Sequence, residues 1–273
     1  MNKQTILITG ASTGIGKETA KYFHAKGWNV IATMRKPDAE EELTQLDNVL
    51  VTQLDVTDLH SIDAAVKLAI NTFGKIDAVL NNAGYGAFGT LESFPRENII
   101  KQYNTNVIGL IDVCKAIIPH FRKNMSGTII NVSSVGGQMT FPLGTLYHGT
   151  KFAVEGISEA LHFEMKEINV NVKIIQPGAI TTDFATRSLD FQHNEDYAEY
   201  QPIVDRLLSV MSEISQTTAS PASLVAETIY EAATDNSDQL RYIVGEDAKL
   251  YIENRKKHGD EAFIAGLKEQ FGI

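Results

Sequence analysis

Apolar runs of strand length recur along the chain, and segments of helical length separate them. The strand-like runs cover residues 5–9, 30–33, 49–53, 78–80, 128–132 and 170–176, and a last candidate covers 241–244. The helical segments include 14–26, 58–73, 95–121 and 147–168. This alternation predicts an α/β fold with a parallel sheet and crossover helices.

The same pattern predicts one domain over residues 1–245, because no Gly/Ser-rich or Pro-rich linker interrupts residues 1–180. Asp58 is placed to cap the helix over 58–73 and Gly74 to close it. From about 179 to 220 the chain is polar and poorly periodic, with an amphipathic segment at 202–215, and we expect a substrate loop there. Residues 246–273 are expected to form a C-terminal helical extension that packs on the outside.

Composition narrows the classes of function. Of the 273 residues, 43% are hydrophobic and 21% charged, which is ordinary for a globular protein. The net charge of −10 disfavours a nucleic-acid partner, and the basic stretch 255–258 is most simply a solvated helix face. The first apolar run is too short for a signal peptide or a membrane span, so we expect a cytoplasmic protein with no membrane partner.

Metal and disulfide chemistry have little support in the sequence. Cys114 is the single cysteine, which excludes an internal disulfide, and its apolar surroundings favour a packed thiol over a nucleophile. No group of His, Asp and Glu has the spacing of metal ligands, so no metal is expected.

The stretch ITGASTGIGKETA follows the first strand and opens the first helix. Its glycines Gly10, Gly14 and Gly16 allow a tight turn and let backbone N–H groups at a helix N-terminus approach a pyrophosphate. A turn that is glycine-rich for packing alone is the alternative. The sequence thus indicates a dinucleotide site.

The end of the second strand bears on which dinucleotide is bound. An acidic residue there would hold the adenosine 2′-hydroxyl, whereas a basic residue would hold a 2′-phosphate. Met34 occupies the position expected for the acid, and Arg35 follows it. We therefore expect NADP(H), with NAD(H) as the second choice if Arg35 is only a surface residue.

Five motifs together resemble the short-chain dehydrogenase/reductase superfamily, in its shorter, single-domain branch. They are TGASTGIG, NNAG at 81–84, NVSS at 131–134, YHGTK at 147–151 and QPG at 176–178. The resemblance covers residues 3–183 and, less distinctly, 220–245. It implies a Rossmann-type doubly wound sheet with helices on both faces. The positions Gly10, Arg35, Asp55, Asn82, Ser134 and Pro177 each come just after a predicted strand, which places them at the carboxyl edge of the sheet, where ligands bind.

The resemblance also implies roles for residues at the matching positions. Asp55 would meet the adenine, although it could equally cap a helix, and Pro177-Gly178 could be a plain turn. The implied cofactor-binding set is Gly10, Ser12, Gly14, Ile15, Gly16, Arg35, Asp55, Val56, Asn82, Ala83, Gly84, Tyr147, Lys151, Pro177, Gly178, Ile180 and Thr182.

Tyr147 and Lys151 lie four residues apart, which places them on one face of a helix. A free tyrosine has a pKa of about 10; a nearby cation and a positive nicotinamide ring would lower it, which suits an acid/base. Ser134 would hold the substrate oxygen. The resemblance adds Asn106 as a residue that helps to position Lys151, with Asn104 as the alternative. His148 is expected to point off this face.

We expect an apolar and aromatic substrate wall, which suits a hydrophobic ketone or aldehyde and its alcohol. Its expected members, besides Ser134, are Tyr85, Phe88, Phe141 and Phe184. The leading hypothesis is an NADP(H)-preferring oxidoreductase. The alternatives are an NAD-dependent alcohol or hydroxysteroid dehydrogenase and a non-catalytic dinucleotide-sensing regulator. Apolar residues on the outer helix faces, such as Ile108, Ile111 and Phe152, further predict a homo-oligomer.

Overall fold

A seven-stranded sheet forms the centre of the computed structural model, which describes residues 3–273 apart from the side chains of residues 185, 214 and 215. The strand order is β11-β7-β6-β4-β1-β2-β3, and every neighbouring pair is parallel. The strands are β1 (Thr5–Ile8), β2 (Asn29–Met34), β3 (Val49–Gln53), β4 (Ala78–Asn81), β6 (Gly127–Val132), β7 (Val170–Pro177) and β11 (Arg241–Val244).

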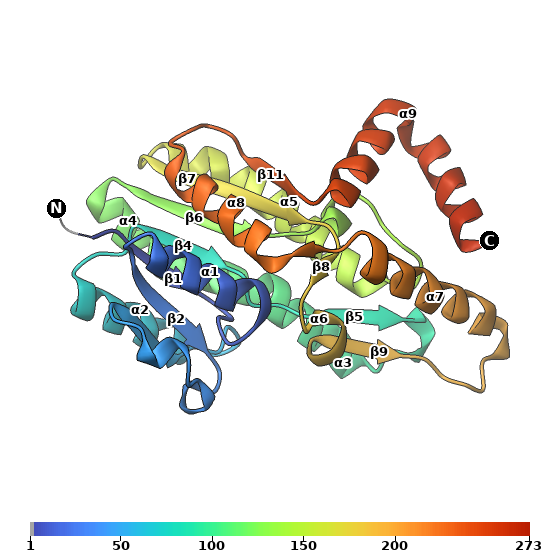
Figure 1. Cartoon of the computed structure of the whole chain (residues 1–273), viewed down its shortest axis with the longest axis horizontal. Coiled ribbons are helices and arrows are strands. Elements are labelled where there is room, and N and C mark those ends of the chain that lie inside the picture. The colour runs from blue at the N-terminus through green and yellow to red at the C-terminus, as the bar shows by residue number, and fades with distance from the viewer. Residues whose placement is uncertain (1–2) are drawn as a thin grey trace.

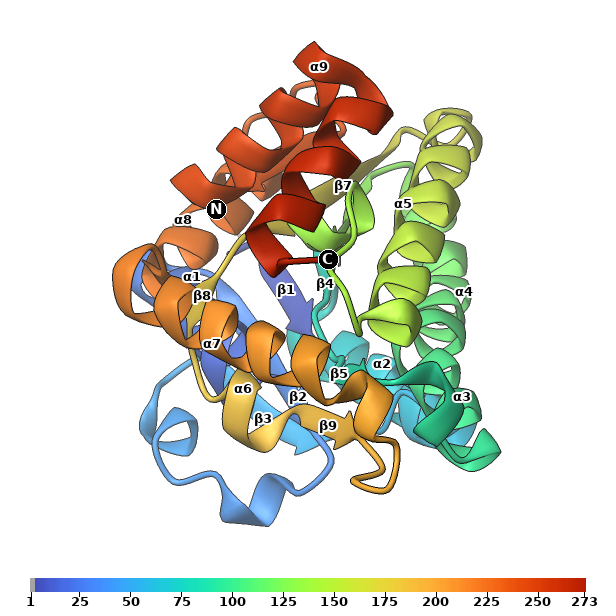
Figure 2. The same ribbon diagram turned by 90° about the vertical axis from the view of Figure 1, so that its right-hand side faces the viewer.

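Helices cover both faces of this sheet (Figures 1 and 2). One apolar core joins the sheet to α1 (Gly14–Ala25) and α8 (Ala222–Thr234). A second core joins the opposite face to α2 (Leu59–Phe73), α4 (Gly109–Asn124) and α5 (Thr145–Lys166). The predicted doubly wound Rossmann-type α/β fold is confirmed.

The residues predicted to cap α2 lie at its two ends. The Asp58 carboxylate accepts a hydrogen bond from the backbone N–H of His60 at 2.9 Å, and Gly74 adopts a left-handed conformation with φ 79°. A capping side chain satisfies a backbone donor that the helix leaves free, and glycine adopts positive φ without strain.

The segment predicted as one helix over 95–121 has an irregular centre. It consists of α3 (Arg96–Tyr103), a π-helical stretch (Asn104–Ile108) and α4. A π-helical stretch widens the backbone, and such stretches are frequent at functional sites. The hydrophobic pattern could not reveal it, because the stretch adds no break in polarity.

The region 179–220, predicted as a substrate loop, contains regular elements. They are β8 (Ile180–Thr181), α6 (Phe184–Arg187), β9 (Leu189–Gln192), α7 (Gln201–Thr217) and the first residue of β10 (Ser220–Pro221). Strand β9 pairs in parallel with β5 (Gly86–Gly89), about 100 residues earlier in the chain. All four residues of β9 are half-buried, so no alternation of polar and apolar residues marks it in the sequence.

The last helix, α9 (Glu246–Phe271), bends at Gly259, where φ is 80° and ψ is 172°. The part after the bend returns toward α7, and both helices cross in front of the carboxyl edge of the sheet in Figure 2. Phe271 is buried with Leu207 and Val210 of α7, and Phe141 packs against the same cluster. The last turn of α9 is therefore anchored on α7.

Candidate active site

The glycine loop between β1 and α1 is shaped by close backbone contacts. Gly10 has φ 69°, and a Cβ atom added at Gly16 would lie 2.4 Å from the Gly10 carbonyl oxygen and 2.6 Å from Asn82 Nδ2. The Asn82 amide donates to the carbonyls of Thr9 and Gly10 at 2.9 and 3.1 Å. The loop is thus held from behind by the end of β4, and the N-terminus of α1 is free to face a ligand.

A cavity of about 1040 Å³ opens beside this loop. Four residues of the predicted cofactor set line it, namely Ser12, Gly14, Arg35 and Asp55. The other lining residues come from the glycine loop and α1, from the end of β2 and the chain after it, and from the segment after β7: Thr13, Lys17, Met34, Lys36, Ala39, Glu40, Glu41, Glu42, Asp183 and Arg187.

Charged side chains of both signs line this cavity. Exposed Arg35 and Lys36 follow the buried Met34 at the end of β2. Lys17 is already paired with Glu40 and Glu42, at 3.0 Å to each. Arg35 and Lys36 are therefore the cations at the end of β2 that can meet an anionic group. At Gly16, the Gly10 carbonyl and the Asn82 amide leave no room for a side chain.

Other members of the predicted cofactor set lie around the same edge. Thr182 packs over Gly14, since a Cβ atom added there would be 3.4 Å from the Thr182 side chain. Asp55 binds Thr57 through its carboxylate, at 2.9 Å to the backbone N–H and 2.7 Å to the hydroxyl. Val56 is buried in the core beneath Gly109, and Ile15 and Ile180 pack against the α1 side of the sheet.

Ser134 and Tyr147 lie at the carboxyl end of β6 and at the start of α5. The Ser134 hydroxyl accepts a hydrogen bond from the Gly136 N–H at 3.0 Å and donates to the Pro177 carbonyl at 3.5 Å. Burial raises the pKa of Tyr147, and the hydrogen bond with Ser134 lowers it. Among the protein's own groups, burial outweighs this hydrogen bond, so the pKa of Tyr147 lies above its ordinary value.

Lys151 lies one turn along α5, and its Nζ is 5.8 Å from the centre of the Tyr147 ring. The ammonium group donates to the Val132 carbonyl at 2.9 Å. Burial lowers the pKa of Lys151 to about 8, and the negative charge of Glu155 acts in the opposite direction. The Lys151 ammonium group thus lies near the Tyr147 ring. With a pKa of about 8, it loses its proton slightly above neutral pH.

Asn106 lies in the π-helical stretch and faces α5. Its side chain accepts from the Tyr85 N–H at 3.1 Å and donates to the Tyr85 carbonyl at 2.9 Å and to Thr150 Oγ1 at 3.1 Å. Asn106 is buried, whereas the alternative residue Asn104 is exposed. Asn106 joins the chain after β4 to the helix that carries Tyr147 and Lys151.

His148 is buried, and both ring nitrogens are occupied. Nδ1 lies 2.9 Å from the Gly136 carbonyl, and Nε2 accepts from the Phe141 N–H at 2.9 Å. Burial lowers its pKa. The side chain therefore fixes the segment between Ser134 and Tyr147, which explains why a histidine stands beside the tyrosine.

The predicted substrate wall is only partly gathered around Tyr147. The rings of Phe88 and Phe184 have their centres 5.1 and 6.0 Å from that of Tyr147. Phe141 instead contacts His148, at 5.7 Å between ring centres, and Tyr85 packs with Phe94 and Leu146 beneath α3.

Sequence reasoning missed the charged residues that the cavity gathers from distant segments. Lys17 lies one turn after the glycine loop, a position from which its approach could have been expected. Asp183 and Arg187 come from the poorly periodic stretch after β7, where the pattern gives no orientation. Within residues 3–273, the side chains that the structure describes include no group of three or more His, Cys, Asp or Glu placed to hold a metal ion.

Comparison with known proteins agrees with this geometry. The family model described as short chain dehydrogenase matches residues 4–193, and the chain belongs to that family. It is 48% identical over 240 residues to an uncharacterized oxidoreductase of Schizosaccharomyces pombe, covering 88% of this chain and all of the relative. It is 42% identical over 202 residues to a 3-ketodihydrosphingosine reductase of Bacteroides thetaiotaomicron, covering 73% of each.

Solved structures give the same result. A short-chain dehydrogenase from Streptomyces avermitilis has a TM-score of 0.84 and 29% identity, over 98% of this chain and 95% of that one. ElxO with NADP bound has a TM-score of 0.73 and 27% identity, over 88% and 97% of the two chains. The protein is thus an oxidoreductase of the short-chain type that uses a nicotinamide cofactor. None of the helices that the structure describes is long and apolar enough to cross a membrane.

Proposed function

We propose that the protein interconverts a hydrophobic ketone or aldehyde with its alcohol, using NADP(H) in preference to NAD(H). The observation that carries the proposal is the position of Ser134, Tyr147 and Lys151 together at the carboxyl edge of the sheet. The Bacteroides relative is named a 3-ketodihydrosphingosine reductase, and reduction of a ketone by that relative supports the substrate class.

Each side chain of this group has a distinct role. Ser134 donates a hydrogen bond to the substrate oxygen, which holds the carbonyl carbon in place. Tyr147 gives its proton to that oxygen in reduction and takes it back in oxidation. Lys151 supplies positive charge beneath the phenol, and Asn106 anchors the helix that carries both. The cofactor, when bound, supplies or accepts the hydride.

Residues of the large cavity would hold the cofactor. The N–H groups at the start of α1 and the residues around Gly14 would meet the pyrophosphate. Asp55 would lie at the adenine, and Arg35 with Lys36 would meet a 2′-phosphate. Pro177, Gly178, Ile180 and Thr182 would face the nicotinamide end. The NADP-bound state of the 27% identical structure supports this preference.

Rate measurements test the chemistry. NADPH oxidation is followed with a panel of apolar ketones and aldehydes, for the wild type, Tyr147→Phe and Ser134→Ala. We expect each variant to lose about 10²- to 10⁴-fold in kcat; Ser134→Ala keeps the NADPH Kd of the wild type, and the NADPH Kd of Tyr147→Phe changes far less than its kcat. Equal turnover by wild type and Tyr147→Phe would refute the assignment, and NADPH binding without turnover of any substrate would favour the regulator.

A cytoplasmic location and self-association complete the proposal. Ile108 and Phe152 are 48% and 42% exposed on the outer faces of the helical layer, and such apolar groups suit contact with a second copy. Light scattering of the purified protein tests this, because a monomer at all concentrations would exclude the homo-oligomer.

A further inference from the structure

Glu155 is a buried carboxylate one helical turn after Lys151, and the proposed mechanism assigns it no role. Its exposed fraction is 4%. Burial of a charged carboxylate is costly unless it is paired and hydrogen-bonded. In this protein three donors meet it, so the site is built to keep the charge.

The three donors come from three different segments, two of which belong to the candidate active site. Gln138 Nε2 donates at 3.0 Å and lies just after the turn that follows Ser134. Gln176 Nε2 donates at 2.9 Å and lies on β7 directly before Pro177. Arg241 Nε donates at 2.9 Å from β11. One carboxylate therefore joins the segments that carry the serine, the tyrosine with its lysine, and the loop at the nicotinamide end.

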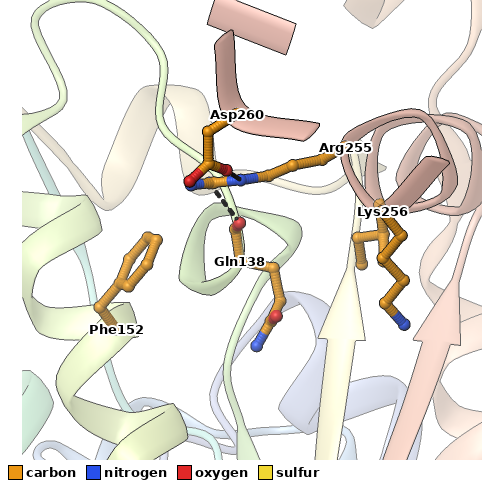
Figure 3. A pocket seen from close by; sticks show the side chains of 6 residues that line it. Gln138, Phe152, Arg255, Lys256 and Asp260 are labelled. Atoms are coloured by element: carbon orange, nitrogen blue, oxygen red, sulfur yellow. Dashed lines mark hydrogen bonds and ion pairs between the residues drawn. The ribbon is translucent and has the colours of Figure 1, made fainter. Parts of the chain in front are cut away.

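The packing around this carboxylate is tight. A Cβ atom added at Gly137 would lie 2.9 Å from Glu155 Cγ and 3.0 Å from the Lys151 carbonyl oxygen. On the far side, Arg255 of α9 donates to the Gln138 carbonyl at 2.6 Å and to Asp260 at 2.8 Å, beside a cavity of about 360 Å³ (Figure 3). The Gln138 backbone is thus held from α9 while its side chain holds Glu155.

The charges around Lys151 and Glu155 come from a small set of elements. Arg241 of β11 also pairs with Glu159, whose side chain is 51% exposed. Lys173 of β7 is bound by Asp235 and Ser237 instead. Tyr147 and His148 lie on the same helix as Lys151, and Arg255, Lys256 and Asp260 of α9 line the cavity beside Gln138.

We propose that Glu155 is a positioning residue for the proposed oxidoreductase chemistry: it fixes the three segments relative to one another and places negative charge one turn from Lys151. This charge favours the protonated ammonium, which burial opposes. This inference rests on the proposed function where carbonyl reduction is measured. Where NADPH binding is measured instead, it rests only on the position of Glu155.

The pH profile of carbonyl reduction distinguishes this role from simple packing. Glu155→Gln removes the negative charge and nearly preserves the shape. The pKa of Lys151 then falls, so the alkaline limb of kcat/KM moves toward acid by about one pH unit. Glu159→Gln is the matched control, since it also removes a carboxylate bound to Arg241 but from an exposed position, and its limb stays in place. Arg241→Gln leaves Glu155 unopposed and moves the limb toward alkali.

These outcomes decide the proposal. An unshifted limb in folded Glu155→Gln, or an equal shift in Glu159→Gln, overturns it. If Glu155→Gln does not fold, the direction of the Arg241→Gln shift decides in its place. If the wild type reduces no carbonyl compound, the proposed function fails on its own. The pH dependence of the NADPH Kd in the same variants then tests the role of Glu155. We expect this dependence to shift toward acid in Glu155→Gln, and an unchanged dependence would contradict the role.

Discussion

The exposed guanidinium of Arg35 makes the cofactor preference testable through a single charge. Arg35 follows β2 and lines the large cavity, whereas the neighbouring cation Lys17 is held by Glu40 and Glu42. We predict that Arg35→Gln weakens NADPH binding and leaves NADH binding unchanged, because the two cofactors differ only in the 2′-phosphate that Arg35 would meet.

The size of the effect follows from Coulomb's law. Opposite unit charges 4 Å apart attract by about 1 kcal/mol in water and by about 4 kcal/mol at an effective dielectric constant of 20. Arg35 is exposed, so the value lies near the water limit, while a phosphate carries about −1.5 to −2 charges. The expected loss is roughly 1.5–3 kcal/mol, which corresponds to about a 10- to 100-fold higher Kd.

Fluorescence titration of NADPH and NADH measures both constants. The matched control is Lys26→Gln, which removes a charge at the other end of α1, where Lys26 lies over the ring of Tyr22. Its two Kd values should equal those of the wild type. In 1 M salt, where the screening length falls to about 3 Å, the difference between Arg35→Gln and wild type should shrink. Equal weakening of NADPH and NADH would refute the role of Arg35.

Three further predictions concern the loop, a helix end and the lysine. Gly16→Ala should weaken NADPH binding at least about tenfold by titration, because the new methyl group would lie 2.4 Å from the Gly10 carbonyl; an unchanged Kd would contradict this. Asp58→Ala should lower the free energy of unfolding in urea by about 1 kcal/mol with no change in NADPH binding, and unchanged stability would count against the cap. Carbonyl reduction by wild type should fall about tenfold from pH 7 to pH 9, since Lys151, with its pKa near 8, is protonated below that pH and neutral above it; a flat profile would argue against a charged Lys151.

The sheet and its ligand edge could be predicted because they depend on local patterns. Each buried strand of the central sheet reads as an apolar run, and parallel pairing then brings all strand ends to one edge. Asp58 and Gly74 could be located for the same reason, since capping depends on residues within one turn. The motifs after β1, β4 and β6 therefore fell near one another without any long-range information.

Contacts between distant segments could not be predicted in this way. The pairing of β5 with β9 depends on backbone geometry and carries no periodic pattern. The return of α9 toward α7 depends on a single glycine bend at Gly259. Glu155 looked like an ordinary helix residue, because the burial and the three donors that set it apart come from elements up to 86 residues away.

In the proposed reaction, hydride passes between a nicotinamide cofactor and a substrate carbon, with Tyr147 as proton donor. The most direct measurement uses NADPH labelled with deuterium at the transferable position and an apolar ketone from the panel, with mass spectrometry of the alcohol. We predict one deuterium on the carbinol carbon with wild-type protein and at least about 100-fold less labelled alcohol with Tyr147→Phe. An alcohol without deuterium, or equal labelling by both proteins, would contradict the claim.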